Sequence, residues 1–425
     1  MSAPEHLPEI DNGLLRFLTC GGVDDGKSTL IGRLLYDTKA ILADTLHAIE
    51  RSSQKRGLAA ADLSLLTDGL VAEREQGITI DVAYRYFTTG RRKYIIADAP
   101  GHEQYTRNMV TAASTANLAI IIIDARRGVL TQTRRHSYIA HLLGIPHLIV
   151  AVNKMDLVDW SETVFESIKA DYLAFAGRLG IEDVRFIPLS ALEGDMVVER
   201  GERLGWYEGP TLLEILETAP AAHAEHAEAF RFPVQYVSRP QTSAYHDFRG
   251  YMGRVESGEI AVGDAVQVLP SGQTTRVADI QIHGQSLERA ISEQSVTLLL
   301  DDDIDISRGD MIVKQGEAPA VTRQIEATLC WLSETPLDLN RRYVVRHTTR
   351  ETRAIVAGID HRLDIHSLER QPAARLSVND IGRVSFRLAQ PLCADLYAEN
   401  RVTGAIIVID EASNNTVGAG MIVAR

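Results

Sequence analysis

The chain has 425 residues, a formal net charge of −13, 45% hydrophobic residues and 24% charged residues. Its length predicts about two to four domains, its near-average composition excludes a disordered or fibrous protein, and its negative charge does not favour general nucleic-acid binding. The three cysteines are far apart, no secretory signal opens the chain and no apolar run could span a membrane, so we expect a cytoplasmic protein without a nucleic-acid or membrane partner.

The first half of the chain alternates short apolar runs with helix-like stretches, which predicts a parallel sheet covered by helices. We expect strands over Leu14–Cys20, Tyr94–Asp98, Leu118–Asp124, His147–Asn153 and Arg185–Pro188. We expect helices over Lys27–Tyr36, Thr131–Leu143 and Glu162–Leu179. Alternating apolar residues at 78, 80, 82, 84 and 86 predict a half-exposed antiparallel strand at the sheet edge.

The character of the sequence changes near residue 219. Residues 220–229 are rich in Ala, His and Glu and are predicted to form a linker. Beyond them, short β-type runs separated by Gly, Asp and Ser predict β-barrels or sandwiches. Examples of these runs are Tyr251–Val255, Ala265–Leu269, Val296–Leu300, Tyr343–Arg346 and Ala405–Ile409. We therefore expect an α/β domain over 1–219, one barrel over 230–320 and another over 321–425.

A phosphate-binding motif, G-x-x-x-x-G-K-[ST], follows the first predicted strand and opens the first predicted helix, the context that this motif requires. Its glycines let backbone N–H groups curl around phosphates, Lys27 reaches the β and γ oxygens, and Ser28 holds Mg²⁺. A chance glycine-rich turn is the weaker interpretation. The predicted phosphate-binding residues are Gly21, Gly22, Val23, Asp24, Asp25, Gly26, Lys27, Ser28 and Thr29.

Two later segments predict the base that is bound. Asn153, Lys154, Met155 and Asp156 end a buried strand. The Asp156 carboxylate can accept hydrogen bonds from N1–H and the exocyclic amine of guanine, whereas adenine would leave it unpaired. GTP is therefore the expected nucleotide. A backbone N–H from the loop after the next strand would complete the pocket, although an ordinary loop is the alternative; its residues are Ser190, Ala191 and Leu192.

Catalytic residues are predicted between the phosphate loop and the base segments. Asp98 ends a strand and could hold Mg²⁺ through water, and Gly101 offers its N–H to the γ-phosphate. His102 could orient and polarise the attacking water, while a surface histidine is the alternative. Thr79 lies where a mobile switch would supply a second protein ligand to Mg²⁺, against the alternative of a β-edge threonine. The segment containing the aspartate is Asp98, Ala99, Pro100, Gly101 and His102.

Taken together, these motifs resemble those of the translational GTPases over the whole chain. Residues 23–35, 72–86 and 101–109 are similar to the family of large, GTPase-type subunits of bacterial sulfate adenylyltransferase. The resemblance implies an α/β P-loop GTPase domain followed by two β-barrel domains, as in translation elongation factors. Two departures are visible: Asp25 stands where elongation factors usually carry His, and Ala99 stands where the family usually has Thr or Cys.

The resemblance also implies a heterodimer. A smaller, ATP-pyrophosphatase-like subunit would transfer AMP from ATP to sulfate, and GTP hydrolysis by this chain would drive that transfer. By the same resemblance, Val23 and Ile78 would form an apolar gate beside His102, and Asp24 would bind a monovalent cation such as K⁺. Two other functions remain open, an elongation factor that delivers aminoacyl-tRNA and a regulatory GTPase without coupled chemistry.

Overall fold

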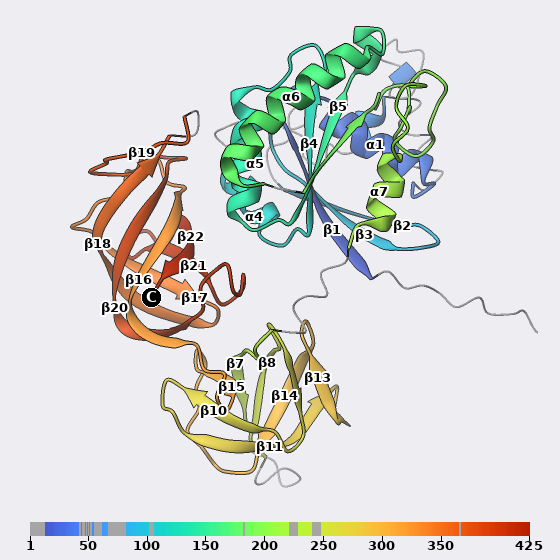
Figure 1. Cartoon of the computed structure of the whole chain (residues 1–425). Helices are drawn as coiled ribbons and strands as arrows, with labels where there is room; N and C mark the ends of the chain where they lie inside the picture. Colours follow the sequence, from blue (N-terminus) through green and yellow to red (C-terminus); the bar gives the residue numbers. More distant parts are fainter. Residues whose placement is uncertain are drawn as a thin grey trace, which may run out of the picture. The chain divides into compact units, whose positions relative to one another are not determined.

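The computed structural model describes residues 13–41, 62–66, 82–101, 106–181, 183–220, 228–239, 248–364 and 367–425, with a few single positions between 44 and 54. The chain divides into two compact units, Met1–Ala222 and His223–Arg425 (Figure 1). The finer domain boundaries at 219, 230 and 320 stay predictions. Within the described ranges, no helix is long and apolar enough to cross a membrane.

A six-stranded sheet forms the middle of the first unit, in the order β2-β3-β1-β4-β5-β6. Its neighbouring strands are parallel except for the antiparallel pair β2 and β3. Every residue of β4 is buried, which accounts for the unbroken run of isoleucines in this strand. The strands are β1 Leu14–Gly21, β2 Ala83–Thr88, β3 Lys93–Asp98, β4 Leu118–Asp124, β5 His147–Asn153 and β6 Val184–Pro188.

Helices cover both faces of this sheet. Figure 1 shows α4, α5 and α6 on one face and α1 and α7 on the other. Leucines of α1 and α7 share one buried core with the sheet, among them Leu34 and Leu216. The helix α6 begins after the capping residue Ser161 and ends at Gly180, whose φ of 71° stops the helix in the left-handed region. The helices are α1 Lys27–Asp37, α4 Thr106–Ala113, α5 Thr131–Leu142, α6 Glu162–Leu179 and α7 Leu212–Thr218.

The edge strand β2 is antiparallel, as the sequence predicts, but its buried face differs from the one that the apolar alternation suggests. Tyr84 and Tyr86 are 44% and 69% exposed. Phe87 instead is buried and stacks on Tyr94 of β3 with ring centroids 4.4 Å apart. The alternating pattern therefore identified the strand without identifying which face packs against the core. Residues 78 and 80 of that pattern lie outside the described residues.

The second unit contains two closed β-barrels. The first has the strand order β10-β15-β7-β8-β14-β11-β12, and pairing of β10 with β11 closes it. A short pair of strands, β9 Glu259–Ala261 and β13 Arg289–Ile291, accompanies it. The strands of this barrel are β7 Phe232–Ser238, β8 Gly250–Arg254, β10 Ala265–Leu269, β11 Thr274–Ile282, β12 Gln285–Leu287, β14 Ser295–Leu300 and β15 Met311–Lys314.

The second barrel has the order β17-β21-β22-β16-β20-β18-β19, and pairing of β17 with β18 closes it. Its core includes Trp331, Tyr343 and Phe386, each almost fully buried. Closure leaves few unpaired strand edges, which is how such small all-β domains avoid edge-to-edge association. The strands are β16 Ala320–Trp331, β17 Arg342–His347, β18 Arg350–Leu363, β19 Arg370–Gln371, β20 Ile381–Ala394, β21 Ala405–Asp410 and β22 Thr416–Ala424.

A buried ion pair joins the two barrels within the second unit. Arg231, just before β7, contacts Asp395, just after β20, through two bonds: Nε to Oδ2 at 2.8 Å and Nη2 to Oδ1 at 3.0 Å. The two side chains are only 6% and 7% exposed. Thr403 also donates its hydroxyl to Asp395 at 2.6 Å. Burial opposes ionisation of Asp395, but these hydrogen bonds hold its pKa below the ordinary value.

The three cysteines are free thiols, and all are buried. Cys20 lies in β1 and Cys330 in β16, and burial raises the pKa of each to about 12. Cys393 lies in β20 and packs with Leu269 and Met311 of the first barrel. Burial raises the pKa of Cys393 to about 11. None of the three is an activated thiolate.

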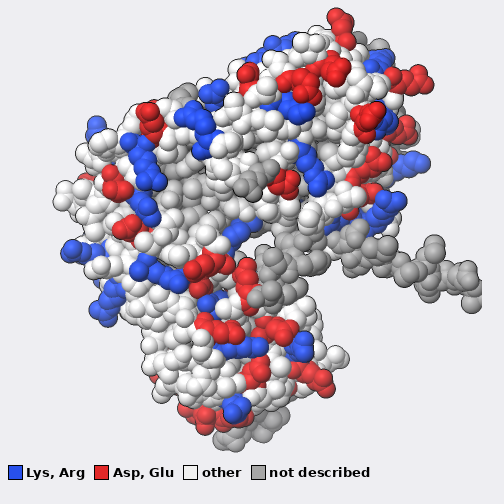
Figure 2. Space-filling view, viewed as in Figure 1, with Lys and Arg blue, Asp and Glu red and all other residues white. Residues whose placement is uncertain are grey.

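Surface charges of both signs are mixed. On the face seen in Figure 2, acidic and basic side chains are interspersed on both units. Pairs on the last barrel include Arg346 with Glu351, and Arg353 with Glu411 at 2.7 Å. Exposed pairs of this kind contribute little to stability, about 0 to 1 kcal/mol each.

Candidate nucleotide-binding site

The predicted site residues lie at one edge of the sheet in the first unit. They follow the carboxyl ends of β1, β3, β5 and β6, which are parallel strands and therefore end on the same side. In open α/β sheets this edge is where ligands bind, at the point where strand order reverses. The loop after β1 carries the phosphate motif, β3 ends at Asp98, β5 ends at Asn153, and Ser190 follows β6.

The phosphate loop turns sharply before α1. Gly26 has a φ of 93°, in the left-handed region that favours glycine, and a Cβ there would collide with the Asn153 amide. Lys27 is 8% exposed, with Nζ 3.4 Å from the Gly21 carbonyl oxygen. Ser28 and Thr29 on the first turn of α1 are half-buried, as is Val23, whereas Asp24 is exposed.

The loop after β3 packs directly against the phosphate loop. A Cβ on Gly101 would lie 2.8 Å from both the Gly21 carbonyl oxygen and Lys27 Nζ, so only glycine fits there. Ala99 and Pro100 are buried beside it. Asp98 is 1% exposed and accepts a hydrogen bond from Thr19 Oγ1 at 3.2 Å.

These groups fit a magnesium-bound phosphate chain. They supply an ammonium group from Lys27, a hydroxyl from Ser28, a buried carboxylate from Asp98 and closely approaching backbone at Gly26 and Gly101. Magnesium prefers oxygen ligands and is usually held by one or two protein groups together with phosphate oxygens. The residues present are therefore suited to this metal and to the nucleotide.

Asn153 joins the phosphate loop to the loop after β6. Its Nδ2 donates to the Asp25 carbonyl oxygen at 2.8 Å, and its Oδ1 accepts from the Ala191 N–H at 2.9 Å. Asn153 is 2% exposed, so both bonds are shielded from water. One side chain therefore fixes the relative position of the two loops.

Lys154 bridges the phosphate loop and the end of β4. Its backbone is left-handed, with a φ of 63°, and its Nζ bonds the Asp24 carbonyl oxygen and lies 3.0 Å from Asp124 Oδ2. Burial opposes ionisation of Asp124, but hydrogen bonds from Arg126 and Lys154 keep its pKa well below the ordinary value. The charged Asp124 carboxylate therefore holds Lys154 at this edge of the sheet, a role that the sequence did not predict.

Asp156 and the loop after β6 are hydrogen-bonded to each other. Ser190 Oγ donates to Asp156 Oδ1 at 2.7 Å, and the Glu193 N–H donates to Ser190 Oγ at 3.1 Å. Met155 is fully buried, Ala191 is buried and Leu192 is 64% exposed. The structure thus brings the predicted base residues, 153–156 and 190–192, into one group.

Two further residues at this edge were not predicted. Arg127 donates to the Val23 carbonyl oxygen at 3.1 Å and lies 3.7 Å from the Asp25 carboxylate. Burial raises the pKa of Asp25, and among the described residues its Oδ1 has no hydrogen-bond partner. Gln132 of α5 donates to the Gly101 carbonyl oxygen at 3.0 Å. Arg127 lies three residues after Asp124, the last residue of β4, and such a position marks it as a candidate, but no local pattern marks Gln132.

Three predicted residues lie outside the described residues: Ile78, Thr79 and His102. Their predicted roles stay predictions. His102 directly follows Gly101, which the structure places against Lys27 of the phosphate loop.

Family models match both ends of the chain. Residues 12–221 match the elongation factor Tu GTP binding domain, and residues 324–423 match the GTP-eEF1A C-terminal domain-like family. With the two closed barrels, these matches confirm the predicted fold, a P-loop GTPase domain followed by two β-barrels.

Similar proteins cover nearly the whole chain. Sulfate adenylyltransferase subunit 1 of Cellvibrio japonicus is 55% identical over 96% of this chain and 86% of its own length. The protein of the same name from Alteromonas mediterranea is 54% identical over 96% of this chain and 87% of its own length. The S. cerevisiae Ski7 GTPase-like domain, solved with GTP bound, aligns over 97% of both chains with a TM-score of 0.53 at 17% identity, a likeness of fold alone.

Proposed function

The chain belongs to the sulfate adenylyltransferase subunit 1 family, and we propose that it is the GTPase subunit of a two-subunit enzyme in which GTP hydrolysis drives adenylyl transfer from ATP to sulfate. The observation that carries this proposal is the combination of that family membership with a phosphate loop and a base loop, residues 190–192, which Asn153 holds together. Family membership supports the reaction in this proposal, and the candidate site supports GTP as the bound nucleotide.

Guanine is the base that the arrangement favours. Asp156 accepts a hydrogen bond from Ser190 through Oδ1, which orients the carboxylate and leaves acceptor capacity for N1–H and the 2-amino group of guanine. Adenine would present an acceptor at N1 and would leave the carboxylate unpaired. The loop 190–192 would add a backbone N–H toward the base.

Hydrolysis would proceed by attack of water on the γ-phosphorus of GTP, releasing GDP and phosphate. Lys27 and the N–H groups of the phosphate loop would hold the β and γ oxygens, and Gly101 would offer its N–H to the γ-phosphate. Mg²⁺, held by Ser28, by Thr79 and through water by Asp98, would neutralise charge on the phosphates. His102 would orient and polarise the water, between the apolar residues Val23 and Ile78. Asp24 would bind a monovalent cation such as K⁺.

The partner would be a smaller, ATP-pyrophosphatase-like subunit, forming a heterodimer with this chain. In its reaction a sulfate oxygen bonds to the α-phosphorus of ATP while the bond to diphosphate breaks, giving adenylyl sulfate. The mixed anhydride formed is high in energy, so the transfer is strongly uphill by itself. This is the reason for coupling it to GTP hydrolysis. The name "subunit 1" of the relatives supports a multi-subunit enzyme.

The decisive measurement uses this chain and its partner, purified together, with ATP and sulfate. Adenylyl sulfate should accumulate to a higher level with GTP than with a non-hydrolysable analogue, and this chain alone should hydrolyse GTP slowly and form none. Equal product levels at equilibrium in both reactions would refute energy coupling and favour a regulatory GTPase. Recovery of aminoacyl-tRNA in a pull-down would instead favour the elongation-factor alternative.

A further inference from the structure

Arg33 links the helix that follows the phosphate loop to the loop that follows β6. Its Nε donates to the Ala191 carbonyl oxygen at 3.2 Å, and its Nη2 donates to the Leu192 carbonyl oxygen. These acceptors are 158 and 159 residues away in the chain. Since Arg33 lies on α1, the helix that begins with Lys27 also holds the base loop.

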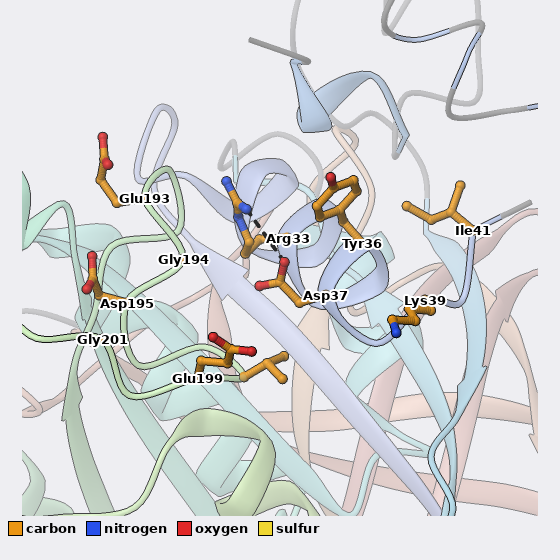
Figure 3. Close-up of a pocket in the computed structure, with 11 residues that line it drawn as sticks. Arg33, Tyr36, Asp37, Lys39, Ile41, Glu193, Gly194, Asp195, Glu199 and Gly201 are labelled. Carbon is orange, nitrogen blue, oxygen red and sulfur yellow. Dashed lines mark ion pairs between the residues drawn. The ribbon is translucent and has the colours of Figure 1, made fainter. Parts of the chain in front are cut away.

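The surroundings fix the orientation of this guanidinium group. Asp37, one turn further along α1, forms an ion pair with Arg33 Nη1 at 3.5 Å, and the Arg33 side chain is 20% exposed. Gly194 has a φ of 93°, and a Cβ there would lie 3.5 Å from Arg33 Cδ. Figure 3 shows Arg33 in this neighbourhood, with the ion pair to Asp37 marked. A planar guanidinium fork suits two carbonyl acceptors and cannot lose its charge.

The bond to Leu192 is the start of a hydrogen-bond chain that reaches Asp156. The carbonyl that accepts from Arg33 belongs to the same peptide group as the Glu193 N–H, which donates to Ser190 Oγ at 3.1 Å. The Ser190 hydroxyl in turn donates to Asp156 Oδ1 at 2.7 Å. All donors in this chain point the same way, so each bond polarises the next.

We propose that Arg33 is a positioning residue for guanine recognition, which fixes the loop 190–192 and, through the Glu193 N–H and Ser190, orients Asp156. This inference rests on the proposed guanine specificity. It predicts that Arg33 acts on the contacts that read guanine, and acts much less on the rest of nucleotide binding.

The test compares Arg33→Met with the wild-type chain. Methionine keeps an apolar stem without donors, and Arg33 lines a surface hollow of about 660 Å³, so the change opens no closed cavity. Inosine diphosphate lacks the 2-amino group that Asp156 would read. Affinity for GDP should fall about tenfold, and affinity for inosine diphosphate by less than about threefold. The reason is that the charge-assisted hydrogen bonds removed with Arg33 support only the residues that contact the base, and inosine diphosphate lacks one of the groups contacted. Arg33→Lys should restore part of the preference.

Arg200→Met is the matched control. Arg200 also donates to two backbone carbonyls of the first unit, those of Gly209 at 2.8 Å and Tyr207, and neither acceptor belongs to a residue predicted to bind the nucleotide. It should leave both affinities unchanged. An unchanged ratio of GDP to inosine diphosphate affinity in Arg33→Met, or an equal shift in Arg200→Met, would overturn the inference while the proposed function stands. A wild-type chain that binds ADP as tightly as GDP would defeat both.

Discussion

Replacing Asn153 with alanine removes the side chain that joins the phosphate loop to the base loop. Asn153 is 2% exposed, donates to the Asp25 carbonyl oxygen at 2.8 Å and accepts from the Ala191 N–H at 2.9 Å. Alanine would leave both backbone groups buried without these partners. The substitution should lower both the stability of the first unit and its affinity for GDP.

The cost follows from counting those two bonds. A hydrogen bond whose loss leaves a buried partner unpaired costs about 1–3 kcal/mol, so the pair should cost about 2–6 kcal/mol. For a unit the size of Met1–Ala222, each kcal/mol lowers the melting temperature by about 2–4 °C. Asn153→Ala should therefore melt about 4–24 °C lower than the wild type.

Thermal unfolding and GDP titration measure the two effects. Asn117→Ala is a suitable control, because Asn117 is also buried at 8% exposure, but among the described residues its side chain accepts a single bond, from the Arg16 N–H at 3.2 Å. It should lose less stability and keep its affinity for GDP. A melting temperature of Asn153→Ala within about 2 °C of the wild type, or an unchanged GDP affinity, would refute the bridging role.

Two other outcomes follow. His102→Ala should keep GTP affinity within a few-fold while hydrolysis slows about 10²-fold, the effect of losing a water-positioning group; equal losses of binding and turnover would make His102 structural. The folded-state pKa of Asp395 lies below its unfolded value, so its stabilising contribution to the second unit is complete above the unfolded pKa of about 4 and is lost as pH falls through the folded pKa. Denaturant unfolding across that acid range should show the loss, and a parallel profile for Asp395→Asn would contradict it.

Short sequence patterns predicted most of the strands and helices that the structure describes in the first unit. The predicted strands Leu118–Asp124 and His147–Asn153 have the observed bounds, because each is a buried apolar run that ends at a polar residue. The phosphate motif was equally clear, since its glycine and lysine spacing is fixed by how the backbone must approach phosphates. Patterns within about ten residues therefore sufficed for these features.

Contacts between distant residues could not be predicted in this way. Arg33 meets Ala191 across 158 residues, and Arg231 meets Asp395 across 164. Either arginine could equally have been a solvated surface charge. The edge strand shows the same limit, because Tyr84 and Tyr86 match a buried alternation and yet are exposed. In each case a partner that is distant in the sequence determines whether the side chain is buried or exposed, and no neighbouring residue indicates that partner.

Because all three thiols are buried, their modification can be used to follow local unfolding of the chain. Burial raises the pKa of Cys20 to about 12, so this thiol is almost entirely protonated at pH 7, and thiolate is the form that reacts. Modification by a thiol reagent therefore waits for local unfolding. The modification rate of Cys20 would measure the opening of the sheet in the first unit, and the modification rate of Cys330 would measure the opening of the last barrel. Cys393, packed against Leu269 and Met311, would become reactive when the two barrels separate.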